Sequence, residues 1–160
     1  MIRIIEADLT QEGQALAWLS LLDGYAEDQM GGGAGLAPRV KQQLIPHILK
    51  RSERLILLAM RDDVAVGLLN AFEGFSTFAA SPLLNIHDVF VHPRARGLGV
   101  GKALFDYAEQ VARTRGYCKL TLEVLTGNMV AQNLYRKQGF EGYSLDDRMG
   151  HALFWQKKLL

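Results

Sequence analysis

The sequence predicts an α/β fold in a single domain, and three observations support this prediction. The chain has 160 residues, a length that suits one domain with its own core. Short apolar runs that read as strands alternate with segments in which apolar residues recur at helical spacing. In residues 83–104, a strand-like apolar run, a glycine-rich turn and an amphipathic helix follow one another directly.

The chain is expected to begin with a strand and a helix. Residues 1–7 predict the strand, and Asp8 or Thr10 is suited to cap the helix that follows. Apolar side chains recur at helical spacing along this helix, at Leu16, Leu19, Leu22 and Tyr25. Residues 31–35, Gly-Gly-Gly-Ala-Gly, predict a flexible break after it.

A second helix and two strands are expected next. The helix is predicted over residues 39–50, where Pro46 should bend it or end it early. Strands are predicted over residues 55–60 and 64–76, with a hairpin turn at residues 61–63 between them.

The second half of the chain is expected to contain the glycine-rich turn and six further elements. A turn at residues 79–82 leads to the strand at 83–91, and the helix after the glycine-rich turn should end near residue 115. The remaining elements are predicted as a strand at 119–124, a short helix capped by Asn128 and ended by Gly139, and two closing strands around 140–144 and 152–157.

The glycine-rich turn predicts a site for an anion, most readily a phosphate. A turn that opens directly into a helix presents unpaired backbone N–H groups and the positive end of the helix dipole to one point. Two familiar phosphate motifs do not fit its spacing. The third glycine of a dinucleotide-binding fingerprint would fall on Lys102, and a Walker A loop would need glycine at Arg96 and Ser or Thr at Ala103.

Two motifs identify a family. Arg96-x-x-Gly99-x-Gly101 resembles the R/Q-x-x-G-x-G/A motif of the GCN5-related N-acetyltransferases (GNAT), whose loop wraps the pyrophosphate of coenzyme A, and Val91-x-Pro93 is the usual lead-in. The later segment Asn128-Met-Val-Ala-Gln-Asn-Leu-Tyr135, followed by Gly-Phe140, resembles the second cofactor segment of that family, N-x-x-A-x-x-L-Y…G-F. The resemblance covers roughly residues 83–140.

The resemblance implies one N-acetyltransferase domain over residues 1–160, with a mixed, mostly antiparallel sheet, flanking helices and a splayed central strand pair. It implies acetyl-CoA as the cofactor, and transfer of its acetyl group to a primary amine of a small molecule or peptide by direct attack on the thioester. The residues expected to contact the cofactor are Val89, Val91, Arg96, Gly97, Leu98, Gly99, Val100, Gly101, Lys102, Asn128, Tyr135 and Lys137.

Tyr135 is the expected general acid. The attack of an amine expels a thiolate whose conjugate acid has a pKa of about 8.5, and a phenol, with a pKa of about 10, can protonate it. The general base stays open among three residues, Glu123, Asp88 and His87.

The acceptor amine is not defined by the sequence. In the resembling enzymes, its pocket would be built partly by the first two helices and their connection, which directs attention to Tyr25, Glu27 and Asp28. Polyamine, amino-acid, aminoglycoside and peptide amines all stay open, as does a longer acyl group on the cofactor. Three other hypotheses are kept: a noncatalytic acyl-CoA-binding sensor of the same fold, a nucleotide-binding protein and a purely structural module.

Composition excludes other classes. A net charge of +1, from 18 basic and 17 acidic residues, argues against a general nucleic-acid binder or a protein of the membrane surface. The N-terminus lacks the pattern of a signal peptide, and the single Cys118 fits a reducing compartment, so a cytoplasmic protein is expected. The sequence has no Cys/His cluster, so a metal site is not expected. A homodimer stays open.

Overall fold

The computed structural model describes residues 1–144 and 146–159, and the chain divides into two compact units. Unit 1 runs from Met1 to Leu122, and unit 2 from Glu123 to Leu160. The single domain over residues 1–160 stays a prediction.

Unit 1 is built on a five-stranded mixed sheet. In spatial order its strands are β1 (Ile2–Glu6), β2 (Arg54–Arg61), β3 (Val64–Ser76), β4 (Ser81–Val91) and β5 (Leu120–Leu122). The first four strands pair antiparallel, and β4 pairs parallel with β5. The predicted α/β class with a mixed, mostly antiparallel sheet is therefore confirmed. The splayed central strand pair stays a prediction.

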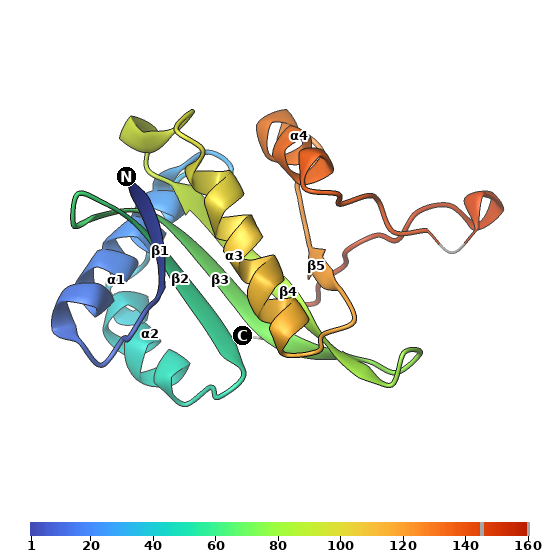
Figure 1. The fold of residues 1–160 in the computed structure, drawn as a ribbon, viewed down its shortest axis with the longest axis horizontal. Helices are drawn as coiled ribbons and strands as arrows, with labels where there is room; N and C mark the ends of the chain where they lie inside the picture. Colours follow the sequence, from blue (N-terminus) through green and yellow to red (C-terminus); the bar gives the residue numbers. More distant parts are fainter. Residues whose placement is uncertain (145, 160) are drawn as a thin grey trace. The chain divides into compact units, whose positions relative to one another are not determined.

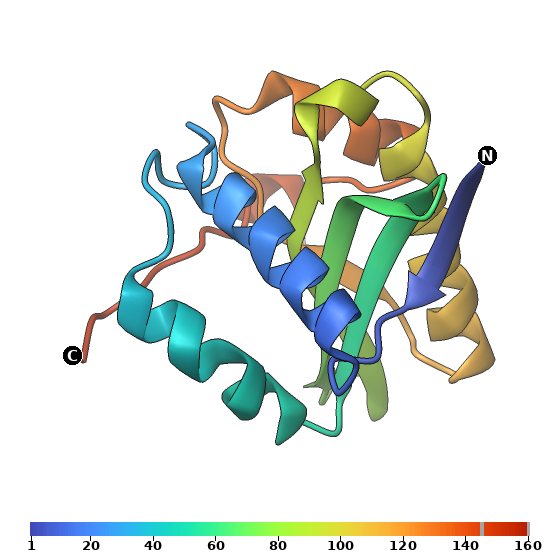
Figure 2. The ribbon, with the colours of Figure 1, turned by 90° about the vertical axis from the view of Figure 1, so that its left-hand side faces the viewer.

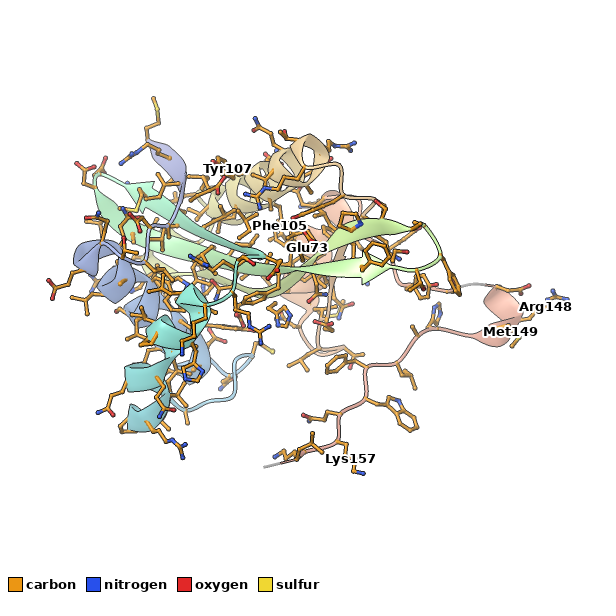
Figure 3. The ribbon with its side chains drawn as sticks, turned by 90° about the horizontal axis from the view of Figure 1, so that it is seen from below. Glu73, Phe105, Tyr107, Arg148, Met149 and Lys157 are labelled. Atoms are coloured by element: carbon orange, nitrogen blue, oxygen red, sulfur yellow. The ribbon has the colours of Figure 1, made fainter. Side chains whose placement is uncertain are left out.

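Helices cover both faces of this sheet. Figures 1 and 2 show α1 (Glu12–Glu27) and α2 (Pro38–Leu49) on one face, and α3 (Val100–Thr114) on the other. The side chain of Phe105 lies between α3 and the sheet and is only 2% exposed (Figure 3).

Strand β2, which lies between β1 and β3, is buried on both faces. Its residues from Leu55 to Ala59 are all buried, and Ile56 and Leu58 pack in one cluster with Trp18 of α1. Because successive side chains of a strand point to opposite faces, the odd-numbered residues lie on the face that α3 covers. A strand covered on both sides reads as a continuous apolar run rather than an alternating one.

Helix α1 buries residues that the predicted apolar series did not include. Its buried residues are Ala15, Trp18 and Leu21, whereas Leu16 of the predicted series is 58% exposed. Leu19, Leu22 and Tyr25 pack at the margin of the cluster and are partly buried. Trp18 is the largest apolar side chain of the helix, and its burial sets the orientation of the whole helix.

The predicted cap of α1 is wrong. Asp8 accepts bonds from the backbone N–H and the hydroxyl of Thr10, which closes a local turn before α1, and the N-cap of α1 is Gln11 without a side-chain bond. Helix α2 has nearly the predicted range, passes through Pro46 and ends at Leu49, so Pro46 does not end it early. A proline so near the end removes only one of the last backbone bonds.

The hairpin between β2 and β3 has the predicted position. Asp62 and Asp63 both have positive φ values, 50° and 61°. Two successive residues in this region make a type I′ turn, whose twist matches that of the two strands.

Unit 2 begins with an irregular segment, and its described residues contain one α-helix, α4 (Met129–Lys137), and a single 3-10 turn at Asp147–Met149. The side chain of Asn128 accepts a bond from the N–H of Ala131 at 3.1 Å, so the predicted cap is confirmed. The two closing strands predicted around 140–144 and 152–157 are not formed among the described residues, where only an isolated bridge joins Ser144 to His151.

Gly139 and Gly150 have φ values of 83° and 79°, and each lies just before one of the two predicted strands. In Figure 3, Arg148 and Met149 lie on a short turn and Lys157 on the extended end of the chain. In the described parts of both units, no helix is long and apolar enough to cross a membrane.

The orientation of α1 can be tested by two substitutions on that helix. We expect Leu21→Ala to lower the free energy of unfolding by about 2–5 kcal/mol, because it leaves a cavity in the core. We expect Leu16→Ala to change it by about 0.5 kcal/mol or less, because this side chain is largely in solvent. Urea unfolding followed by circular dichroism measures both. Equal losses would contradict the observed orientation.

Candidate functional site

Strand β4 contains one extra residue, His87, relative to its partner. Asn70 of β3 pairs with Asp88, and the next residue, Ala71, pairs with Ile86, so His87 forms a β-bulge. Along a strand, successive backbone N–H groups point alternately to its two sides. One extra residue therefore reverses the side to which the N–H groups after it point.

Hydrogen bonds before and after the bulge show this exchange. The N–H of Leu84 donates to the carbonyl of Lys119, toward β5, at 3.0 Å. The N–H of His92 donates to the carbonyl of Val66, toward β3, at 2.9 Å. By alternation, the N–H groups of Val89 and Val91 point away from β3.

Within the described part of unit 1, no strand lies beside this stretch of β4. Strand β5 ends at Leu122, which pairs with Ile86. The backbone of Val89–Val91 on that side is called the free edge of β4 below. The backbone amide of Val89, one of the residues expected to contact the cofactor, lies on this edge.

The bulge also changes the face of the sheet to which the even-numbered side chains of β4 point. Ile86 lies opposite Ala71, on the face that α3 covers. Phe90 packs in one cluster with Trp18 on the face that α1 covers, and Asp88 shares that face.

The glycine-rich turn follows the free edge without a break. Residues Pro93–Ala95 form a single 3-10 turn, and Gly97 and Gly99 have φ values of 78° and 79°. Helix α3 then begins at Val100 without a side-chain cap, and its first backbone bond runs from the N–H of Ala103 to the carbonyl of Gly99 at 3.0 Å.

The N–H groups of Val100, Gly101 and Lys102 therefore precede the hydrogen-bonded part of α3. Apart from the two adjacent residues, no heavy atom of the described chain lies within 4 Å of a Cβ built on Gly97 or Gly99, so the turn is open on that side. Unpaired N–H groups at the positive end of a helix suit the oxygens of a diphosphate.

Arg96 is held at the turn by three contacts. Its Nε donates to the carbonyl of Val91 at 3.1 Å, and its terminal nitrogen donates to the Asp28 carboxylate at 2.9 Å. Its guanidinium carbon lies 5.9 Å from the centre of the Phe90 ring. The side chain of Lys102 instead turns along α3, with its Nζ 2.5 Å from the carboxylate of Asp106.

The connection between α1 and α2 folds around Asp28. The backbone carbonyl of Asp28 accepts bonds from the N–H groups of Gly31, Gly32 and Gly33. A Cβ on Gly31 would lie 1.8 Å from the carbonyl oxygen of Tyr25, so only glycine fits there. The break that the sequence predicts as flexible is thus a folded turn.

The carboxylate of Asp28 is also engaged. Its pKa is lowered first by a bond from the backbone N–H of Met30 and then by Arg96. Of the other residues expected at the acceptor site, Glu27 is exposed at the end of α1, and Tyr25 is partly buried with its ring 6.0 Å from that of Phe90. Burial raises the pKa of Tyr25, and the charges of Asp88 and Asp28 raise it further.

A buried polar chain connects three elements on this face of the sheet. The indole Nε1 of Trp18 donates to Oδ1 of Asn70 at 2.8 Å, and Nδ2 of Asn70 donates to the Asp88 carboxylate at 2.9 Å. Sequence reasoning missed Trp18 and Asn70. The available signal was a lone amide within an otherwise apolar run of β3.

The carboxylate of Asp88 differs from those of Asp23 and Asp28 because its partner is not a basic side chain. Asp23 pairs with Lys41 at 2.5 Å, which is the largest cause of its lowered pKa, and Asp28 pairs with Arg96. Asp88 accepts from a neutral amide and has no ion pair among the described residues. Its negative charge is therefore not compensated by a basic side chain.

The two other candidates for the base lie elsewhere. His87 is exposed at the bulge, and its ring meets Phe72 edge to face at 5.0 Å. Glu123 is exposed and is the first residue of unit 2. Among the residues that the structure describes, no group of three or more His, Cys, Asp and Glu side chains could hold a metal ion.

The remaining predicted residues belong to unit 2. Tyr135 is partly buried on α4, and its ring centre lies 6.2 Å from that of Phe140. Asn128 caps the helix, and Lys137 is exposed at its last position. Their contacts with a cofactor stay a prediction.

Comparison with known proteins agrees with both motifs. The model of the acetyltransferase (GNAT) family matches residues 18–140. A solved structure described as a probable acetyltransferase superimposes with a TM-score of 0.78 at 25% identity, covering 98% of this chain and 99% of that one.

Two curated relatives are similar over part of their length. Streptothricin acetyltransferase of Streptomyces lavendulae is 38% identical over 92 residues, which are 56% of this chain and 49% of that protein. The uncharacterized N-acetyltransferase YhfO of Bacillus subtilis (strain 168) is 31% identical over 93 residues, 58% of this chain and 62% of that protein. The match thus spans less than two thirds of either relative.

The backbone of the glycine-rich turn can be tested by stability. We expect Gly99→Ala to lower the free energy of unfolding by about 1–2 kcal/mol, because an L-residue is strained at its positive φ. Gly13→Ala is the matched control, since its added Cβ also meets no heavy atom within 4 Å. It lies in α1 and should raise stability by about 0.5 kcal/mol. If both substitutions stabilise, the turn is not left-handed at Gly99.

Proposed function

Because the chain belongs to the acetyltransferase (GNAT) family, we propose that it is an N-acetyltransferase that moves an acetyl group from acetyl-CoA to a primary amine of a small molecule or peptide. The observation that carries this proposal is the free edge of β4, which leads directly into the open turn at the uncapped start of α3. An extended ligand arm can pair with such an edge as an added strand, and a diphosphate can sit at such a turn.

The residues of unit 1 fit the phosphate-bearing end of coenzyme A. The N–H groups of residues 97–102 would surround the diphosphate, and Arg96 would add charged donors. Val89 and Val91 would bond the pantetheine arm through the free edge. In unit 2, the proposal assigns Asn128, Tyr135 and Lys137 to the same cofactor on the strength of the motif.

The chemistry divides among a few groups. Acetyl-CoA supplies an activated acetyl thioester. The N–H of Val89 would donate to the thioester oxygen as negative charge develops there. Asp88 is the proposed base and would take a proton from the acceptor ammonium, so that a new C–N bond replaces the C–S bond. Tyr135 would give its proton to the departing thiolate and would regain one from the attacking nitrogen, which carries an extra proton until the amide forms.

Asp88 is preferred over the other two candidates for the base because of its surroundings. It lies one residue from the Val89 amide, on the face that α1 covers, and no cation of the described chain neutralises it. After burial, the charge of Asp88 is the next cause that raises the pKa of the partly buried Tyr25. An uncompensated carboxylate beside an aromatic side chain suits a cationic amine, and streptothricin acetyltransferase is one relative with a named substrate. We place the reaction in the cytoplasm.

Binding of the cofactor tests the role of the turn. We expect coenzyme A to raise the melting temperature more than ATP or NAD does. Arg96→Gln should weaken the affinity for coenzyme A about tenfold, because it removes charge-assisted bonds to the diphosphate. Arg94→Gln, in the same turn, should weaken it less than about threefold. Isothermal titration calorimetry measures both, and stronger protection by ATP or NAD would point to a nucleotide-binding protein.

Turnover separates an enzyme from a sensor of the same fold. We expect thiol release from acetyl-CoA with at least one member of a panel of polyamines, amino acids, aminoglycosides and peptides. Tyr135→Phe should lower kcat by about 10²–10⁴-fold, because the thiolate would leave without a proton. Tyr117→Phe is the control, since its hydroxyl bonds Glu73 at 2.6 Å on unit 1 and should leave kcat unchanged. Tight binding of coenzyme A without turnover of any amine would favour the sensor.

A further inference from the structure

Asn70 is the only polar residue that is fully buried in the described part of the chain, with 2% of its surface exposed. It lies in the middle of β3, between Trp18 of α1 and Asp88 of β4. A buried amide is costly unless its hydrogen bonds are made, and here both ends of the amide are bonded. The residue therefore depends on two partners from two other elements.

Trp18 decides which way the amide of Asn70 points. An indole nitrogen can only donate a hydrogen bond, so it requires the oxygen end of the amide. The NH₂ end must then face Asp88, where it donates to Oδ2 at 2.9 Å. The orientation of the amide is thus set from the α1 side, and Asp88 is offered a donor.

The backbone register supports the same arrangement. Asn70 and Asp88 are direct cross-strand partners at the first pair after the bulge. Their side chains share one face of the sheet, as directly paired residues do. Because Asn70 holds Oδ2, the other carboxylate oxygen of Asp88 remains available to a further donor.

We propose that Asn70, oriented by Trp18, is a positioning residue that holds the Asp88 carboxylate toward the acceptor amine. This inference rests on the proposed function. In the step concerned, a proton passes from the acceptor ammonium to the free oxygen of Asp88, and the nitrogen keeps the electron pair with which it attacks the thioester carbon. The proton leaves to water after the acetylated product departs.

A positioning role predicts effects that a purely structural role does not. If Asn70 only filled space and satisfied Trp18, its replacement would impair all acceptors alike. If it acts through Asp88, the loss should be confined to acceptors that must give up a proton before attack. Alkylamines are ammonium ions at neutral pH, whereas hydroxylamine and aromatic amines are already neutral there.

The test compares Asn70→Leu, Asp88→Asn and the double variant on these two kinds of acceptor. For an alkylamine, we expect kcat/KM to fall about 10²-fold in Asn70→Leu, while the KM for acetyl-CoA stays within about twofold. For hydroxylamine, kcat/KM should stay within about threefold. The double variant should be no worse than Asp88→Asn alone, because the two residues act as one unit. Equal losses on both acceptors, or additive losses, would overturn the proposal.

Two further variants guard against a failure to fold. Asn70→Leu leaves the Trp18 indole without its partner, so Trp18→Phe combined with Asn70→Leu removes the unsatisfied donor and should recover part of the stability that Asn70→Leu alone loses, less the cost of the smaller ring. The loss on the alkylamine should persist in this pair. Asn85→Leu is the matched control, since the Asn85 amide bonds the Thr121 hydroxyl at 2.8 Å and does not touch Asp88. It should keep full activity on both acceptors.

A spectroscopic measurement separates this inference from the proposed function. The chain has two tryptophans, so a ¹H–¹⁵N spectrum contains two indole signals, and Trp155→Phe identifies that of Trp18. We expect Asp88→Asn to shift the Trp18 signal, because the change is transmitted through the Asn70 amide. If the Trp18 signal shifts but no amine is acetylated, the contacts from Trp18 through Asn70 to Asp88 are supported and the proposed acetylation is refuted. No response to Asp88→Asn would overturn the role of Asn70, whatever the activity.

Discussion

Strand β4 has to serve two purposes with one backbone, and the rest of unit 1 depends on how it does so. Its first half completes the sheet through parallel pairing with β5, and its second half must offer unpaired groups. The extra residue His87 separates the two halves. Without it, the N–H groups of Val89 and Val91 would be used by β3, and the stretch beside the glycine-rich turn would have no free edge.

The same extra residue links the edge to the interior. It turns Asp88 and Phe90 toward α1, where Phe90 packs with Trp18 and Asp88 meets Asn70. The N–H groups of Val89 and Val91 therefore point away from β3 in the plane of the sheet, while the carboxylate of the adjacent Asp88 points to the face that α1 covers. Both kinds of group belong to β4, and a strand within a sheet holds them more firmly than a loop would.

Local features of this protein were readable from the sequence, and long-range ones were not. The glycine-rich turn, the Asn128 cap and the hairpin at residues 61–63 follow from neighbouring residues, and the sequence predicted their positions. The bulge at His87 is visible only against the register of β3, and the bond from Trp18 to Asn70 joins residues 52 positions apart. The buried side of α1 could not be read from its leucines because they surround most of the helix, and only packing against the sheet selects a side.

The side chain of Arg96 is ordered in advance by contacts within the chain. Its guanidinium has five N–H groups, and two contacts, with the Val91 carbonyl and the Asp28 carboxylate, already fix its direction. An arginine that is free in solvent loses up to about 2 kcal/mol of rotamer entropy when it is immobilised. In this chain much of that loss is incurred on folding, with spare donors left over. An anion that reaches the turn therefore meets a preorganised arginine, and little of its binding energy is consumed in ordering that side chain.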